Sequence, residues 1–169
     1  NPSEPPMARH RSSALPLAWL YAALIVYASL YPFSGWRWPG TGLPDFLTHP
    51  WPRWWTGFDL VANLFGYLPL GVLVFGAALR SERSEAVAIA VGCAVGAGLS
   101  VTMELLQNFL PRRVPSNLDL ALNSLGSALG AALEHQLLPG LFVGGRVELE
   151  RSTNYTPNRF LFYVRLATD

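Results

Sequence analysis

The stretch SNLDLALNSLGSALG, residues 116–130, determines how this chain is organised. It opens an apolar run with an acid, Asp119, and places an amide, Asn123, one helical turn further in. The stretch TGFDLVANLFG, residues 56–66, has its own acid and amide at the same spacing. Thr or Ser, Asp, Leu, Asn and Gly recur at matched positions, and such a match is hard to ascribe to chance. The repeat predicts two equivalent helices.

Each stretch begins as a helix N-terminus does. Thr or Ser followed three residues later by Asp is a capping-box arrangement, which satisfies unpaired backbone N–H groups, and negative charge there suits the helix dipole. Capping therefore explains Asp59 and Asp119 about as well as a functional role does. Asn63 and Asn123 lie too deep to be caps. As purely structural groups they would form inter-helix hydrogen bonds, which contribute about 0.6 kcal/mol on average in a measured membrane protein.

The composition indicates a membrane protein. Hydrophobic residues make up 51% of the 169 residues and charged residues only 14%, whereas an ordinary soluble domain has about 25% charged residues. The formal net charge is +1, and the 12 basic residues are all Arg, placed singly or in pairs. Nucleic acid is not an expected partner, because its recognition needs a concentrated basic patch.

Residues typical of soluble-enzyme chemistry are sparse. Cys93, the one cysteine, lies in an apolar run rich in Gly and Ala, so we expect it to pack as a small buried hydrophobe. His10, His49 and His135 are far apart and match no metal-ligand pattern. The sequence therefore predicts no metal site and no cofactor.

Four segments are long and apolar enough to cross a bilayer, which takes about 20 residues of helix. They span residues 15–33, 58–79, 86–110 and 118–138. The second and fourth, which carry the repeated template, enter the membrane from the same side. The sequence predicts an all-α fold, a four-helix transmembrane bundle built from two parallel two-helix repeats.

The chain is expected to divide into three parts. These are a cytoplasmic N-terminal segment at residues 1–14, the transmembrane domain at residues 15–143 and a C-terminal tail at residues 144–169. The tail contains RVELE and RFLFYVRL, which resemble strands, around the turn signal NYTPN. A short β-hairpin, the start of a longer soluble region and a disordered segment all remain open for it.

Orientation follows from the excess of Arg expected in cytoplasmic loops. With the N-terminus inside, the Arg residues that flank the first three spans divide equally between the two sides. Arg146 and Arg151, after the fourth span, then lie inside as well. We expect a multi-pass protein of the bacterial inner membrane with both termini in the cytoplasm.

The connection between the first two spans is rich in tryptophan. Residues 35–55, GWRWPGTGLPDFLTHPWPRWW, hold five of the six Trp residues. Trp prefers the headgroup level, where its ring is apolar and its N–H is wet. The connection is expected to lie along the membrane surface, either as an anchoring belt, which is the simpler interpretation, or as part of a ligand groove.

Small residues four apart occur in the third and fourth spans. GCAVG at residues 92–96 and GSALG at residues 126–130 follow this spacing, which lets helix backbones approach closely. These two spans are expected to pack together through them.

The third span ends in polar residues. Glu104, Gln107 and Asn108 lie at i, i+3 and i+4, hence on one helical face. A carboxylate at the centre of a span costs about 2.5 to 3.5 kcal/mol, so Glu104 is expected to have a partner. Arg112 and Arg113 follow the helix end, where the helix dipole also favours a cation, and are the predicted partners.

These groups are expected to meet at one membrane face. The third span ends on the side where the second and fourth begin, which the Arg count makes the extracytoplasmic side. Asn108 is expected at this face too. Ionisable residues within spans mark functional sites by default. The predicted ligand-binding residues are Asp59, Asn63, Glu104, Gln107, Arg112, Arg113, Asp119 and Asn123.

Three blocks carry a family resemblance. DLVANLFGYLPLG, ELLQNFLPRR and DLALNSLGSALG, in this order within residues 21–138, resemble the VanZ-like membrane proteins, a family named for a protein associated with low-level resistance to the glycopeptide teicoplanin. The tail is not part of this resemblance. The pattern positions that the resemblance implies are Asp59, Asn63, Pro69, Gly71, Glu104, Gln107, Arg112 or Arg113, Asp119, Asn123 and Gly126.

Three functions are compatible with these features. The protein would bind, or control access of, an amphiphile at the outer membrane face, such as a glycopeptide antibiotic or a lipid-linked cell-envelope precursor. Alternatively, Glu104 or Asp119 would act as general acid or base of a membrane-embedded enzyme on a lipid headgroup. In the third interpretation the polar residues hold together a bundle that is a structural partner in a homo- or hetero-oligomeric membrane complex.

Overall fold

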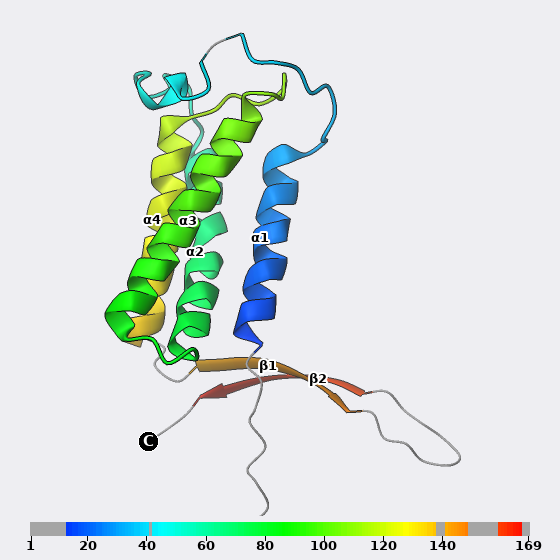
Figure 1. Cartoon of the computed structure of the whole chain (residues 1–169), viewed down its shortest axis with the longest axis vertical. Helices are drawn as coiled ribbons and strands as arrows, with labels where there is room; N and C mark the ends of the chain where they lie inside the picture. The colour runs from blue at the N-terminus through cyan, green and yellow to red at the C-terminus, as the bar shows by residue number, and fades with distance from the viewer. Residues whose placement is uncertain (1–12, 41, 138–140, 149–158, 167–169) are drawn as a thin grey trace, which may run out of the picture.

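The computed structural model describes residues 13–40, 42–137, 141–148 and 159–166. Four helices succeed one another along the chain (Figure 1). They are α1 Ala14–Leu30, α2 Gly57–Leu79, α3 Glu85–Gln107 and α4 Asn117–Leu137, with a short 3-10 helix, η1, at Asp45–Leu47. The four predicted helices are confirmed, although α3 ends at Gln107 rather than at Leu110. The predicted N-terminal segment lies almost entirely outside the described residues, as do Arg151 and the NYTPN turn.

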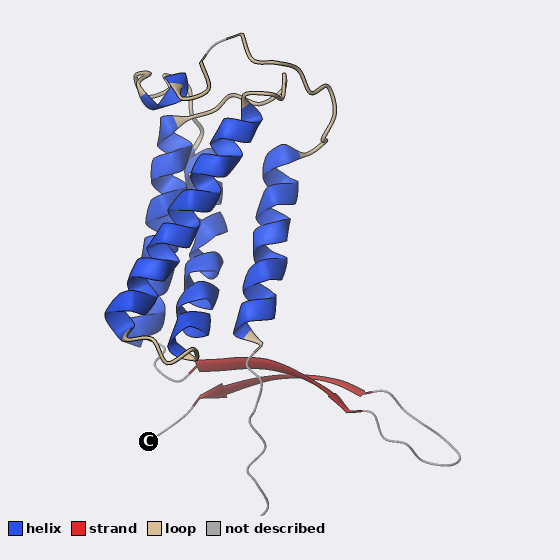
Figure 2. Cartoon of the chain, viewed as in Figure 1, coloured by secondary structure: helices blue, strands red, loops and turns tan. Residues whose placement is uncertain are grey.

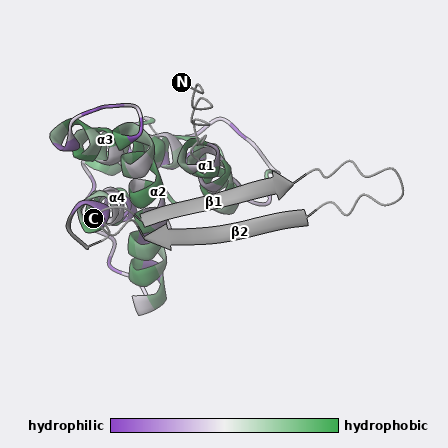
Figure 3. Ribbon diagram, turned by 90° about the horizontal axis from the view of Figure 1, so that it is seen from below, coloured by the Kyte–Doolittle hydropathy of each residue, from purple (hydrophilic) through white to green (hydrophobic). Residues whose placement is uncertain are grey.

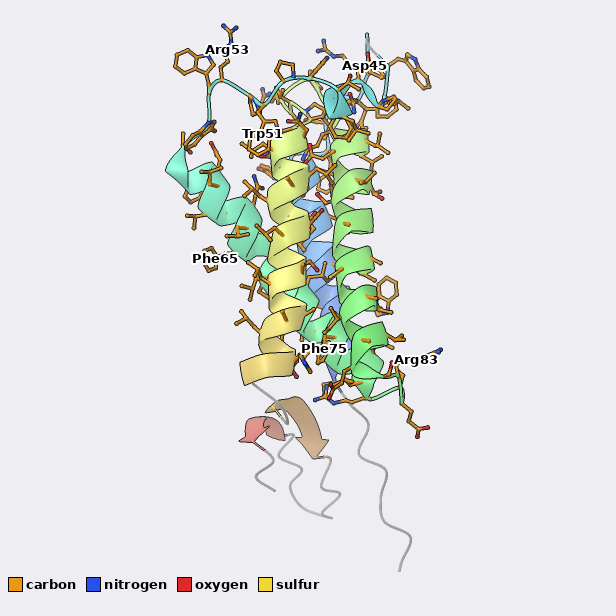
Figure 4. All side chains as sticks on the ribbon, turned by 90° about the vertical axis from the view of Figure 1, so that its left-hand side faces the viewer. Asp45, Trp51, Arg53, Phe65, Phe75 and Arg83 are labelled. Carbon is orange, nitrogen blue, oxygen red and sulfur yellow. The ribbon has the colours of Figure 1, made fainter. Side chains whose placement is uncertain are left out.

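The four helices run alternately up and down, so α2 and α4 begin at the same end of the bundle (Figure 1). This is the relation that the repeat predicted. Long connections cross that end, whereas a short turn with Glu82 at φ +59° joins α2 to α3 at the other. Figure 4 shows α2 inclined across α4, with its first turns splayed away from the rest of the bundle.

The tail contains a β-hairpin. β1 Leu141–Glu148 pairs antiparallel with β2 Arg159–Leu166, with Leu141 opposite Leu166 and Glu148 opposite Arg159. Both strands lie beyond the end of the bundle at which α1 begins (Figure 2). Seen from that end, the helices are coloured mostly as hydrophobic (Figure 3). Of the alternatives left open for the tail, the described residues form the hairpin.

Backbone contact between α2 and α4 depends on glycine. A Cβ atom placed on Gly126 would overlap the carbonyl oxygen of Leu64, and one on Gly130 would overlap that of Leu68. A Cβ on Gly71 of α2 would overlap the Ser127 carbonyl oxygen in return. The two helix axes can come this close only because these positions carry no side chain.

The predicted packing of α3 on α4 is confirmed, but only one of its two glycine pairs takes part. On α3, Gly92 faces Ala131 and Gly96 faces Ser127. The Ser127 hydroxyl donates to the Gly92 carbonyl at 2.9 Å. Gly126 and Gly130 were expected to face α3, and this was wrong, because the rotation of α4 turns them toward α2.

The bundle is apolar outside as well as inside. Its largest buried cluster joins α1, α2 and α3 and includes Ile25, Leu30, Tyr67, Leu70, Met103 and Leu110. Large apolar side chains are also exposed on all four helices, among them Leu20, Phe65, Val91 and Leu125. Phe65, for example, points away from the bundle (Figure 4). Within the described residues, α2 and α3 are long and apolar enough to cross a membrane, and α1 is a shorter apolar helix.

Candidate ligand-binding site

A cavity of about 710 Å³ lies at the end of the bundle where α2 and α4 begin and α1 and α3 end. Residues of all four helices and of both long connections line it. The lining includes every residue predicted for the site: Asp59, Asn63, Glu104, Gln107, Arg112, Arg113, Asp119 and Asn123. The structure thus brings these residues together, and their binding of a ligand stays a prediction.

In the first repeat, the acid is used as a cap. The Asp59 N–H donates to the Thr56 hydroxyl oxygen at 3.1 Å, and the Thr56 N–H donates to the Asp59 carboxylate at 2.9 Å. The Thr56 hydroxyl also donates to the same carboxylate oxygen at 2.7 Å. This is a complete capping box, so the capping interpretation holds for Asp59.

In the second repeat, the carboxylate of Asp119 does not act as a cap. The Asp119 N–H donates to the Ser116 hydroxyl oxygen at 3.2 Å, as the template requires. The Ser116 N–H, however, donates at 2.8 Å to the carboxylate of Glu104, which comes from α3. No described residue donates a hydrogen bond to the Asp119 carboxylate, which lines the cavity. Two segments alike in sequence therefore present their acids differently.

Glu104 lies at the base of the cavity, with 2% of its surface exposed. Its predicted partners were Arg112 and Arg113, and this was wrong: no ion pair joins them within the described part of the chain. The Ser116 N–H is the partner instead. It belongs to the N-terminus of α4, where unpaired donors and the helix dipole both stabilise a carboxylate.

The two arginines have different surroundings. One Nη atom of Arg113 donates to the carbonyl oxygens of Ala28 at 2.9 Å and Tyr31 at 3.1 Å. It therefore satisfies the C-terminus of α1, the helix end that a cation stabilises. Arg112 is exposed at the mouth of the cavity and hydrogen-bonds to no described residue.

The two amides at the end of α3 hold neighbouring segments. Gln107 lines the cavity, and its Nε2 donates to the Ser29 carbonyl of α1 at 3.3 Å. Asn108 does not line the cavity. Its Nδ2 donates to the carbonyls of Glu104, Leu105 and Leu43, so it caps α3 and anchors the Trp-rich connection. It lies at the expected end of the bundle but outside the cavity.

The amides of the repeat also diverge. Asn123 has 4% of its surface exposed, and its Nδ2 donates to the buried Ser100 hydroxyl at 3.0 Å, while its Oδ1 has no partner. Asn63 is half-buried and hydrogen-bonds to no described residue. Only the second amide therefore forms the predicted inter-helix bond.

Tyr67 is a cavity residue that sequence reasoning missed. It has 4% of its surface exposed, and its hydroxyl is buried near the Ser100 hydroxyl without forming a hydrogen bond of ordinary geometry. It lies four residues after Asn63, hence on the same helical face. That spacing could have indicated that Tyr67 belongs to the site. A tyrosine in an apolar span is, however, equally typical of the hydrophobic core.

The Trp-rich connection contributes to the cavity wall. Trp54 and Trp55 line the cavity, whereas Trp38 packs edge-on against Phe109 with ring centroids 5.5 Å apart. The Asn117 side chain fixes the connection by donating to the His49 carbonyl. Two tryptophans of the connection thus lie at the cavity, and the anchoring belt and the ligand groove both stay predictions.

The fold and its cavity define a small four-helix protein with an apolar exterior and a polar site at one end. The family model for VanZ/LLP1 matches residues 18–138, and the chain belongs to this family. The family model for the C-terminus of cellulose synthase operon protein C matches residues 121–169, which comprise most of α4 and the hairpin. No curated protein and no solved structure matches the chain.

Proposed function

We propose that this VanZ/LLP1 protein binds the polar head of an amphiphile in the cavity and thereby controls its access to the membrane surface. The ligand would be an amphiphile such as a glycopeptide antibiotic or a lipid-linked cell-envelope precursor. The observation that carries the proposal is the meeting of eight polar residues, from three helices and one connection, around one cavity. Its volume of about 710 Å³ falls within the roughly 300 to 1,000 Å³ of ligand pockets.

All four helices would cross the membrane. The polar side chains of α4 that lower its hydropathy, among them Asn123, Ser127 and Glu134, are buried in the bundle, while Leu125 and Leu129 are exposed. Its outer face is thus suited to lipid although its mean hydropathy is modest. α1 has 17 residues, the lower end of the roughly 17 to 25 that a span needs.

The mouth of the cavity is proposed to face the cell exterior, with both termini in the cytoplasm. In a Cys93→Ala background, a cysteine replacing Val114 at the mouth should react with a membrane-impermeant maleimide in intact cells. Ser81→Cys, at the opposite end, should react only after permeabilisation. The reverse labelling pattern would place the site at the cytoplasmic face.

Substitutions of the two repeat amides, Asn63 and Asn123, distinguish an effect on ligand binding from an effect on fold stability. Asn63→Ala should leave the melting temperature unchanged, because Asn63 makes no described hydrogen bond, yet weaken ligand binding about tenfold, the effect of one lost hydrogen bond of about 1.4 kcal/mol. Asn123→Ala should also destabilise the fold by about 1 kcal/mol through its bond to Ser100. Thermal unfolding and native mass spectrometry of copurified ligand measure the two effects.

Ser124→Ala is the matched control, because Ser124 bonds only to its own helix, at the Leu120 carbonyl, and does not line the cavity. It should leave binding unchanged. If Asn63→Ala destabilises the fold as much as Asn123→Ala and binding follows stability, the polar residues are structural and the ligand proposal fails.

A second candidate is an enzyme acting on a lipid headgroup. It is favoured by one observation, that Asp119 lines the cavity without a described hydrogen-bond donor while Glu104 is joined to the same turn through Ser116. A free carboxylate beside a buried one is a suitable general base. Asp119→Asn that retains bound lipid but abolishes its turnover would support this candidate.

A further inference from the structure

The cavity is electrostatically graded from its mouth to its base. Arg112 lies exposed at the mouth, while the guanidinium of Arg113 is already engaged by carbonyl oxygens of α1. Deeper in, the cavity wall carries the carboxylates of Asp119 and Glu104. Asp59 also lines the cavity, but its carboxylate accepts hydrogen bonds from Thr56 in the capping box. A ligand group that reaches the base therefore meets negative charge, and Arg112 is the cation available to a group that remains at the mouth.

Two buried polar atoms at the base form no hydrogen bond of ordinary geometry, although the Ser100 hydroxyl lies near one of them, the hydroxyl of Tyr67. They are Oδ1 of Asn123 and the hydroxyl of Tyr67, on side chains each 4% exposed, and both residues line the cavity. Buried polar atoms are paired in more than about nine cases in ten, since leaving one unpaired costs free energy. An amide oxygen can only accept, so a group that pairs with Asn123 must donate.

An ammonium group matches this set of acceptors. It carries positive charge and three donors with no acceptor. The Asp119 carboxylate, the Asn123 oxygen and the Tyr67 hydroxyl offer it acceptors from α2 and α4. A phosphate in the same place would face the carboxylates of Asp119 and Glu104, and like charges in a poorly solvated site repel strongly.

We infer that the cavity selects a zwitterionic headgroup whose primary ammonium occupies its base and whose phosphate lies against Arg112 at its mouth. This inference rests on the proposed function and names the ligand class for that site. The chemistry is that of a phosphoethanolamine group, carried by a membrane lipid or free in solution. A quaternary ammonium has the charge but no N–H donor for Asn123, and a glycerol headgroup lacks the charge for Asp119.

The test compares three lipids with the purified full chain in detergent. Dioleoyl phosphatidylethanolamine should bind about tenfold more tightly than the phosphatidylcholine and phosphatidylglycerol with the same acyl chains, as measured by native mass spectrometry at equal lipid fractions. Free phosphoethanolamine is added as competitor. Displacement of the lipid at matched concentration shows that the headgroup alone is recognised, whereas no displacement assigns the ligand to the lipid.

Two variants assign the two ends of the headgroup, and a third is their control. Asp119→Asn should remove the preference for phosphatidylethanolamine without weakening phosphatidylglycerol. Arg112→Gln should weaken both lipids by the same factor, because both carry a phosphate. Arg53→Gln is the matched control, since Arg53 lies on the connection that lines the cavity but does not line it itself, and it should change neither affinity.

Tyr67→Phe tests the inference with a variant that is expected to fold as stably as the wild type. The Tyr67 hydroxyl lies near the Ser100 hydroxyl but forms no hydrogen bond of ordinary geometry. Removing it should therefore change the melting temperature little, yet weaken phosphatidylethanolamine binding threefold or more. Equal binding of all three lipids, or an amine preference that survives both Asp119→Asn and Tyr67→Phe, overturns the inference and leaves the proposed function standing. Failure of the wild-type chain to retain any amphiphile overturns the proposed function itself.

Discussion

Gly126→Ala is expected to lower the free energy of unfolding by about 2 to 3 kcal/mol, the upper part of the roughly 1 to 3 kcal/mol that forcing extra atoms into a packed contact costs. The added methyl group would overlap the Leu64 carbonyl oxygen, which is backbone and cannot rotate away. α2 and α4 would have to separate over their whole crossing. Because Asn63 and Asn123 lie near this crossing on the cavity wall, ligand binding should fall as well.

Gly66→Ala is the matched control, since Gly66 is the corresponding position of the first repeat. A Cβ atom on Gly66 meets nothing within 4 Å. The change should therefore leave stability unchanged or raise it by up to about 1 kcal/mol, the helix-propensity difference between Ala and Gly. Thermal unfolding of both variants in the same detergent measures the difference. Equal destabilisation at the two positions would show that α2 and α4 are not in backbone contact.

Glu104→Ala is expected to lower the free energy of unfolding by about 2 to 3 kcal/mol. The change leaves the Ser116 N–H without its acceptor, at a cost of about 1 to 3 kcal/mol. It also removes a negative charge from the N-terminus of α4, which is worth up to about 2 kcal/mol when partly buried. Loosening this terminus should disturb Asp119 and weaken ligand binding at the same time.

Glu104→Gln separates the hydrogen bond from the charge. The amide oxygen can still accept from Ser116, so most of the stability should remain, whereas affinity for an ammonium group should fall. Glu85→Ala is the surface control: Glu85 is exposed and lies 3.5 Å from His135, and such pairs contribute about 0 to 1 kcal/mol. A Glu104→Ala protein as stable as wild type would mean that the contact with Ser116 does not hold α4 in place.

Much of the fold and the composition of the site could be predicted from the chain alone. Four apolar runs, each bounded by Pro, Gly or Arg, marked the four helices. Pro and Gly end helices, and Arg is costly inside a membrane span, so these residues mark where each run stops. The repeat then placed Asp59 and Asp119 at one end. The short connection between α2 and α3 placed Glu104 at the same end, because a helix that follows another through a short turn must run antiparallel to it.

The partners of these residues could not be predicted in this way. Helical periodicity gives the face on which Glu104 lies but not which backbone N–H faces it, so sequence reasoning chose the nearby arginines over Ser116. Likewise, the spacing of Gly126 and Gly130 indicates a close approach and leaves the neighbour unspecified. Trp54, Trp55 and their path over the cavity follow from an irregular connection, for which no periodicity exists.

The sequence by itself determined four helices, a repeated helix start and the set of polar residues at one end, because these depend on local spacing and chain direction. Only the tertiary structure decided that the glycines of α4 face α2. It also decided that the Glu104 carboxylate, rather than that of Asp119, accepts the Ser116 N–H, so that Asp119 lines the cavity without a described hydrogen-bond donor. These outcomes depend on the rotation and crossing angle of each helix. Packing of the whole bundle fixes both quantities at once, so no single segment encodes them.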